Sequence, residues 1–195
     1  MNLKCWYETK IDINQAIRND WKYPSDNLID FRLWRYEASN VFNTVWLKYM
    51  SDIGLPVAKL ILFYRTPQSI DKTAHVDLRI AKNATVFPTW LFALNWVVGG
   101  NDSEMSWFDE PVDIQKPVSW TENSLPYRSW PLRELSIIDK KSIQSTLTLV
   151  RTDVPHNIRT GNTPRWGFSI RSPYKETSWN EIVDRLARNN LLLER

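Results

Sequence analysis

The sequence predicts a mainly β protein, a sandwich or jelly roll of short strands with a helix near each end of the chain. Seven segments between residues 57 and 170 show period-two alternation or short apolar runs rich in β-branched and aromatic residues. The two helical segments flank this region instead of alternating with strands, which argues against a parallel α/β sheet. A length of 195 residues, 43% hydrophobic and 24% charged, fits one domain spanning 1–195 with its core at about 57–171.

The first expected helix covers residues 39–50. Its apolar side chains fall at i, i+3, i+4, i+7 and i+8, the spacing of one helix stripe packed on a sheet. They are Phe42, Val45, Trp46, Tyr49 and Met50.

The second expected helix covers residues 177–189. Ser178 and Glu181 have the spacing of a capping box, which marks the start of a helix. The apolar stripe that follows consists of Trp179, Ile182, Val183 and Leu186. We therefore expect this helix also to pack on a sheet from outside.

The expected strands are short and separated by turn signals. They cover residues 57–64, 74–80, 92–98, 104–108, 132–138, 146–150 and 166–170.

Composition and charge narrow the classes of function. The net charge is only +3, and lysine and arginine are scattered along the chain, so a nucleic-acid partner is not indicated. We find neither a signal-like apolar stretch at the N-terminus nor a segment of membrane-spanning length, which predicts a cytoplasmic protein without a membrane partner. The single cysteine, Cys5, excludes an intramolecular disulfide, agrees with a reducing compartment and is given no catalytic role. The oligomeric state stays open.

Both histidines of the chain lie in sequence contexts that suit a metal ligand. His75 and Asp77 are two residues apart on an expected strand, so their side chains emerge on the same face. His156 follows a β-like run and precedes the turn residues Gly161 and Asn162, which places it near a strand end. Two imidazoles and one carboxylate leave three adjacent positions open on an octahedral iron(II) ion. Oxygenases need such positions for a bidentate co-substrate and dioxygen.

Basic residues follow the second histidine. By strand alternation, Arg165 and Arg171 lie on one face, together with Gly167 and Ser169. A dicarboxylate co-substrate requires a guanidinium for its distal carboxylate, because the planar fork donates two charge-assisted hydrogen bonds at once. An arginine on the solvated face of an edge strand is the alternative interpretation.

These motifs resemble those of the 2-oxoglutarate and iron(II)-dependent oxygenase superfamily: TAHVD, then VPH, then Arg165 nine residues later. The segments ALNWVVGGNDSEMSWF, LVRTDVPHNI and RWGFSIR look like bacterial and phage-type hydroxylases, the group that includes the aspartyl/asparaginyl and prolyl hydroxylases. The resemblance covers roughly residues 57–171. Aspartyl/asparaginyl hydroxylases often lack the carboxylate ligand, so the intact pair of His75 and Asp77 separates this chain from them.

The resemblance implies a double-stranded β-helix, the cupin-like jelly roll. It makes His75, Asp77 and His156 the catalytic iron(II) ligands. It makes Arg165 the anchor for the C5 carboxylate of 2-oxoglutarate, with Arg171 in reserve and Asn95 as a polar contact to the co-substrate. The implied reaction uses O2 to convert 2-oxoglutarate to succinate and CO2 while hydroxylating a substrate, which is an amino acid, a peptidyl residue or a small metabolite.

Two other functions stay open. A zinc-dependent hydrolase or isomerase on a cupin-like barrel also uses histidine and carboxylate ligands, although many such sites recruit a third histidine. A catalytically silent jelly roll that serves as a binding module is the other. Residues 109–131 are a candidate lid or substrate loop, or an ordinary surface connection. Trp107 and Phe108 line either the substrate side of the site or the core.

Overall fold

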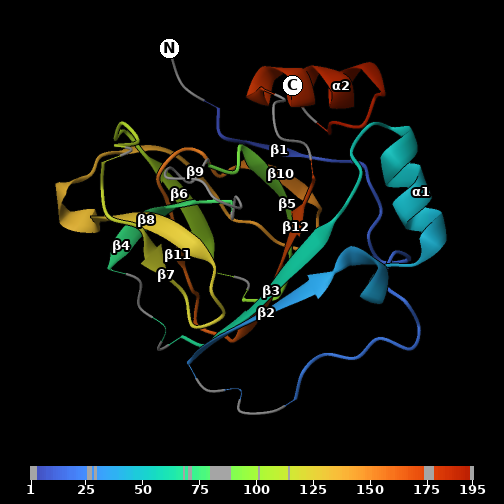
Figure 1. The fold of residues 1–195 in the computed structure, drawn as a ribbon, viewed down its shortest axis with the longest axis horizontal. Helices are drawn as coiled ribbons and strands as arrows, with labels where there is room; N and C mark the ends of the chain where they lie inside the picture. Colours follow the sequence, from blue (N-terminus) through green and yellow to red (C-terminus); the bar gives the residue numbers. More distant parts are fainter. Residues whose placement is uncertain are drawn as a thin grey trace.

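The chain folds into two antiparallel sheets of six strands each, which face one another (Figure 1). The computed structural model describes residues 4–25, 28, 30–67, 69, 72–79, 89–100, 102–113, 115–173 and 178–193. The mainly β class with flanking helices is therefore confirmed.

The first sheet has the strand order β1-β10-β5-β12-β3-β2. Its strands are β1 (Trp6–Glu8), β10 (Thr148–Arg151), β5 (Phe92–Gly99), β12 (Arg165–Arg171), β3 (Lys59–Arg65) and β2 (Phe31–Glu37). The second sheet has the order β7-β8-β4-β11-β6-β9. Its strands are β7 (Ser119–Trp120), β8 (Pro126–Pro131), β4 (Thr73–Asp77), β11 (His156–Arg159), β6 (Glu104–Phe108) and β9 (Ile137–Lys141).

Both helices cover the outer face of the first sheet, on the side away from β4 and β8 (Figure 1). They are α1 (Thr44–Asp52) and α2 (Trp179–Arg188). One large cluster of buried side chains joins them to the sheet, including Trp46 and Met50 from α1 and Ile182 and Leu186 from α2. A second cluster fills the space between the sheets, with Phe63, Val97 and Val150 from the first sheet and Met105, Trp107 and Ile158 from the second.

The two helices match their sequence patterns to different degrees. In α2 both hydrogen bonds of the capping box between Ser178 and Glu181 form, as predicted. Helix α1 begins later than predicted, because Ala38–Asn40 forms a 3-10 turn and the Asn43 side chain caps the helix by accepting from Trp46 N at 2.9 Å. Within the predicted stripe, Val45 is 79% exposed, so that part of the prediction was wrong.

One expected strand, 132–138, was wrong over most of its length, since only residues 137 and 138 belong to a strand, β9. The segment instead contains a 3-10 turn, Leu132–Glu134, between β8 and β9. Proline at 131 lacks the N–H that would continue the ladder, and Leu135 N donates to Leu132 O at 3.1 Å to close the turn. The other six expected strands are present, with ends shifted by up to three residues. Two predicted end residues, Ile80 and Thr177, lie outside the described residues.

Candidate metal centre and pocket

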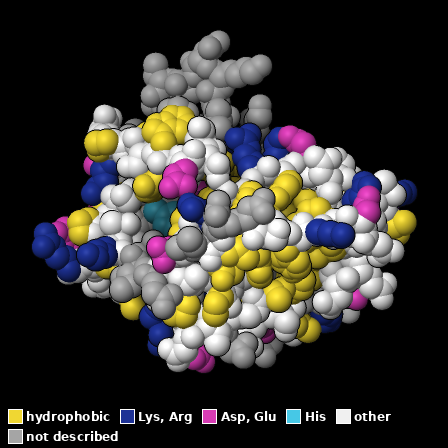
Figure 2. All heavy atoms as spheres, turned by 90° about the horizontal axis from the view of Figure 1, so that it is seen from below, with side chains coloured by type: hydrophobic (Ala, Val, Ile, Leu, Met, Phe, Trp, Pro, Cys, Tyr) yellow, Lys and Arg dark blue, Asp and Glu magenta, His cyan; other side chains and the backbone are white. Residues whose placement is uncertain are grey.

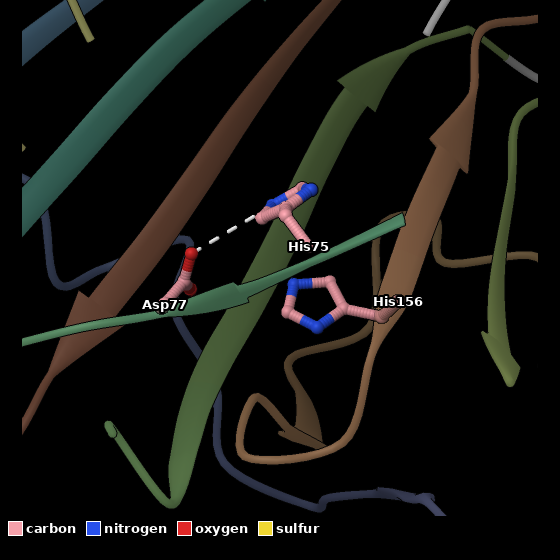
Figure 3. A group of neighbouring side chains, drawn as sticks. All are labelled: His75, Asp77 and His156. Atoms are coloured by element: carbon pink, nitrogen blue, oxygen red, sulfur yellow. Dashed lines mark ion pairs between the residues drawn. The ribbon is translucent and has the colours of Figure 1, made fainter. Parts of the chain in front are cut away.

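The three predicted metal ligands lie on two neighbouring strands of the second sheet. In the register of β4 and β11, His156 stands directly opposite His75, and Asp77 follows two residues later on β4. Figure 3 shows the three side chains pointing toward one another from these strands. One ligand atom from each residue lies within 4.8 Å of the other two, and His75 Nε2 is 3.7 Å from Asp77 Oδ1. This group could hold a metal ion.

The protein prepares His156 to act as a neutral ligand. Its Nδ1 donates a hydrogen bond to the carbonyl of Val154 at 2.9 Å, which leaves Nε2 as the lone-pair nitrogen. Burial and then the neighbouring His75 lower the pKa of His156 to about 3, because the opposing effects of Asp77 and the hydrogen bond to Val154 are smaller. The imidazole is therefore unprotonated at neutral pH.

Asp77 is held ionised by a buried guanidinium. Burial alone would raise its pKa, but the charge of Arg171 and its hydrogen bond to the carboxylate outweigh that effect and hold the pKa well below its usual value. Arg171 donates to Asp77 Oδ2 through a short hydrogen bond and to Thr152 Oγ1 at 3.4 Å. Because Oδ2 is occupied by Arg171, Oδ1 is the oxygen that faces the histidines.

A cavity of about 380 Å³ opens onto this group between the two sheets. Figure 2 shows a hollow on this face with a histidine side chain at its base. The volume is in the range of small-molecule sites. Beside His75, Asp77 and His156 the cavity wall is polar and includes Thr152 and Arg171. Along β3 the wall is apolar at Ile61 and Phe63 and ends at the cationic side chain of Arg65. The lining from the first sheet consists of Phe31, Leu33, Ile61, Phe63, Arg65, Asn95, Ser169 and Arg171.

Asn95, for which the resemblance implies a contact to the co-substrate, lines the cavity. It is 6% exposed and lies opposite Ser169 in the register of β5 and β12. Its Oδ1 has no hydrogen-bond partner among the described residues. A buried polar atom that faces a cavity without a partner marks a place where a bound molecule would make a hydrogen bond.

The two candidate arginine anchors lie in different places. Arg171 lines the cavity beside Asp77, whereas Arg165 is not among the lining residues. Arg165 is buried (3% exposed), with its guanidinium carbon 5.6 Å from the centre of the Phe63 ring, and Phe63 is a cavity wall. Burial and then the charge of Arg65 lower the pKa of Arg165 to about 9.

The candidate loop at 109–131 contributes to the cavity. Its second half forms the hairpin of β7 and β8, and residues 120–123 and 125–127 line the cavity. Asn123 donates to Leu33 O on β2, and Glu122 lies 3.7 Å from Arg32, so the hairpin joins the second sheet to the edge of the first. Trp120 is half-exposed at this mouth.

Trp107 and Phe108 belong to the core rather than to the cavity. Trp107 is fully buried and donates through Nε1 to Arg151 O at 2.9 Å. Neither residue lines the cavity.

Sequence reasoning missed Arg65 and Thr152. Arg65 ends β3, one residue beyond the predicted strand, and its position on the inner face follows from alternation with Phe63 and Ile61. Extending the predicted strand by one residue would have found it. No pattern singled out Thr152, which follows β10.

Comparison of the chain with protein-family models, curated proteins and solved structures found no match. Within the part of the chain that the structure describes, neither helix has the length and apolar character needed to span a bilayer.

Proposed function

We propose that this chain is an iron(II)- and 2-oxoglutarate-dependent oxygenase on a double-stranded β-helix, and that it hydroxylates a substrate bound in the cavity. The observation that carries the proposal is the group of His75, Asp77 and His156 facing a cavity that also contains guanidinium groups. Two imidazoles and one carboxylate form the facial set that non-haem iron(II) oxygenases use.

The strand order supports the jelly-roll part of the proposal. From β3 to β6, consecutive strands alternate between the two sheets, and the same alternation returns from β9 to β12. The hairpin of β7 and β8 is inserted between these two halves and pairs with β4 through β8. A chain that alternates between two sheets in this way forms the two interleaved halves of a jelly roll.

The donor set fits an iron(II) ion. Nitrogen and oxygen ligands suit iron(II), and a site with three protein ligands on one side leaves the opposite side to the cavity. When bound there, iron(II) with 2-oxoglutarate and O2 supplies the oxidising chemistry that a C–H bond requires. His75, Asp77 and His156 would hold the ion.

Residues around the candidate ligands orient them or line the adjoining cavity. Val154 O orients the ring of His156, and Arg171 fixes the carboxylate of Asp77, so these two donors need little reorganisation to bind an ion. Asn95 and Ser169 offer hydrogen bonds along the cavity wall. The apolar side chains of Ile61 and Phe63 exclude water from the space beside the metal group.

The direct test is anaerobic titration of iron(II) and 2-oxoglutarate, followed by addition of O2. We expect one iron per chain, a visible charge-transfer band on addition of 2-oxoglutarate, and succinate after O2 is admitted in the presence of ascorbate. The His156→Ala variant serves as the control and should show neither band nor succinate. Succinate formation by that variant at the wild-type rate would contradict the proposed ligand set.

The same experiment separates the zinc-dependent alternative. A zinc hydrolase would bind Zn²⁺ at the same three residues but give no charge-transfer band with 2-oxoglutarate, because the band requires an oxidisable metal. A protein that binds metal tightly and gives no band with any 2-oxo acid would favour the hydrolase.

A further inference from the structure

Strand β2 is the last strand of the first sheet, so one of its long edges is not paired with another strand (Figure 1). Just before β2, Thr66 N donates to Asp30 O at 2.8 Å, and just after it Ala38 N donates to Ala58 O at 3.0 Å. Hydrogen-bonded pairs alternate in an antiparallel ladder, so the even-numbered residues of β2 pair with β3. The N–H and C=O groups of the odd-numbered residues point to the free edge, where no backbone hydrogen bond from another described residue reaches them.

The odd-numbered residues of β2 also have their side chains on the inner face of the sheet, where the cavity lies. Phe31 and Leu33 line the cavity, as does Ile61, which stands opposite Arg35 on β3. A strand added to this edge would continue the first sheet, and its side chains would alternate in the same way. Every second side chain of the added strand would therefore lie on the cavity side, beside Phe31 and Leu33.

The edge of β2 already accepts a hydrogen bond from a side chain of the hairpin. The amide of Asn123, between β7 and β8, donates to Leu33 O. A side-chain amide has the chemistry of a peptide N–H, and this one stands where the N–H of an added strand would be. Apolar surface lies next to it, because Phe31 is 37% exposed and Trp120, on the hairpin side of the cavity mouth, is 50% exposed.

Arg35 places a positive charge on the same edge. Its side chain is exposed and forms no ion pair with another described residue. The other charged side chains of β2 are paired, Arg32 with Glu122 and Glu37 with Lys59. On an added strand, an acidic side chain opposite Arg35 would gain a charge-assisted contact.

We infer that the substrate is an extended segment of a polypeptide, which pairs with the free edge of β2 and places one apolar side chain in the cavity. The entering side chain lies beside Leu33, and an acidic residue two positions away lies opposite Arg35. The inference rests on the proposed function, because the residue in the cavity is taken as the one that is hydroxylated. It selects a peptidyl residue over a free amino acid or a small metabolite, since neither of these has a backbone that can pair with a strand edge.

A second copy of this chain fits the edge less well than a single extended strand does. The hairpin reaches the edge at Leu33 through Asn123, so an added strand has to displace one side chain, whereas a second folded copy would meet the hairpin itself. Two copies would also bring their own Arg35 side chains to the same edge, where like charges repel.

The probe is a library of random nonapeptides displayed on phage and selected against the metal-free chain. The best-binding peptide is synthesised in three forms with identical side chains: unmodified, and N-methylated on one or the other alternate set of amides. Only the amides that face β2 donate to it, so one methylated form should lose affinity about tenfold or more and the other less than about twofold. Fluorescence polarisation measures the affinities. Similar losses in both forms, or no peptide with a Kd below about 1 mM, would overturn the inference.

Charge reversal tests whether the peptide lies on β2. The Arg35→Glu variant should weaken the selected peptide about threefold to tenfold, and lysine in place of the acidic residue of the peptide should restore the affinity. Arg133→Glu is the matched control, because Arg133 is exposed and outside the cavity lining. It should bind the unmodified peptide as the wild type does. An unchanged affinity in Arg35→Glu, or an equal loss in both variants, would refute the placement on β2.

Binding and turnover are measured separately. Binding to the metal-free chain tests the strand edge, whereas mass spectrometry of the peptide after incubation with iron(II), 2-oxoglutarate and O2 tests whether an oxygen atom is incorporated. If the peptide binds as predicted but gains no oxygen and no succinate forms, the binding surface stands and the proposed function fails. If succinate forms with a free amino acid or a small metabolite while no peptide binds, the proposed function stands and the polypeptide substrate is wrong.

Discussion

The buried arginines at the two ends of the cavity have different surroundings. At the metal end, Arg171 is paired with Asp77 and hydrogen-bonded to Thr152, so its charge is balanced within the protein. At the other end, Arg65 and Arg165 stand opposite each other, and burial and then the charge of Arg65 lower the pKa of Arg165.

This difference distinguishes interactions that stabilise the folded protein from groups that are available to a ligand. A balanced buried pair fixes geometry before anything binds, and removal of one partner leaves an uncompensated charge. The buried Nε of Arg165 has no hydrogen-bond partner among the described residues, so this guanidinium contributes less to folding than one in a balanced pair. The four predictions below test this contrast, from the largest expected effect to the smallest.

The largest effect is expected from loss of a metal ligand. Each of His75→Ala, Asp77→Ala and His156→Ala should weaken binding of iron(II) by at least about a hundredfold, because a three-ligand site loses a third of its donors. Anaerobic competition with a chromophoric chelator measures the affinity. Wild-type iron affinity in two of the three variants would place the metal elsewhere.

The next effect is expected from Arg171→Met. Removal of the guanidinium leaves the carboxylate of Asp77 without its partner, so we expect the metal-free protein to lose about 2–4 kcal/mol of unfolding free energy. Urea unfolding at neutral pH measures the loss. The second substitution in Arg171→Met/Asp77→Asn should restore part of it, and a purely additive double variant would show that the pair does not interact.

At the opposite end, Arg165→Met should behave differently from Arg171→Met. The substitution relieves repulsion with Arg65 and keeps an apolar stem beside Phe63, so the free energy of unfolding of the metal-free chain should change by less than about 1 kcal/mol. The same urea titration measures it. A loss as large as that of Arg171→Met would remove the contrast between the two ends.

The smallest effect is expected from Glu122→Gln in the hairpin at the cavity mouth. The ion pair with Arg32 spans 3.7 Å between largely exposed groups, so its loss should leave the thermal midpoint unchanged within error. Metal affinity should also be unchanged. A large shift in either quantity would show that the hairpin is coupled to the site more strongly than its contacts indicate.

The grouping of His75, Asp77 and His156 could be predicted from the sequence because the chain has only two histidines and one of them stands two residues from a carboxylate on a strand. Strand alternation then gives the shared face. His156 was predicted near a strand end, and it is the first residue of β11, across from His75 in the second sheet, but the strand β11 itself was not predicted. Pairing between distant strands is set by the whole fold, which local patterns do not contain.

The positions of the two arginines could likewise be predicted only in part. Alternation put Arg165 and Arg171 on one face, but it could not tell that Arg171 reaches Asp77 while Arg165 lies behind the ring of Phe63. Likewise, the expected strand at 132–138 contained the right apolar residues, yet Pro131 and the turn that follows it divided them between two elements. Side-chain reach and proline geometry decide these cases, and neither has a periodic signature.

The single register pair that joins β4 to β11 also bears on how the chain folds. His75 and His156 lie 81 positions apart, so their strands meet only after a long loop of chain has closed. An ion held by both residues would bind only after that loop has closed, so the free energy of its binding would add directly to the stability of the folded chain. Loss of the ion would then remove stabilisation at the one register pair that joins β4 to β11.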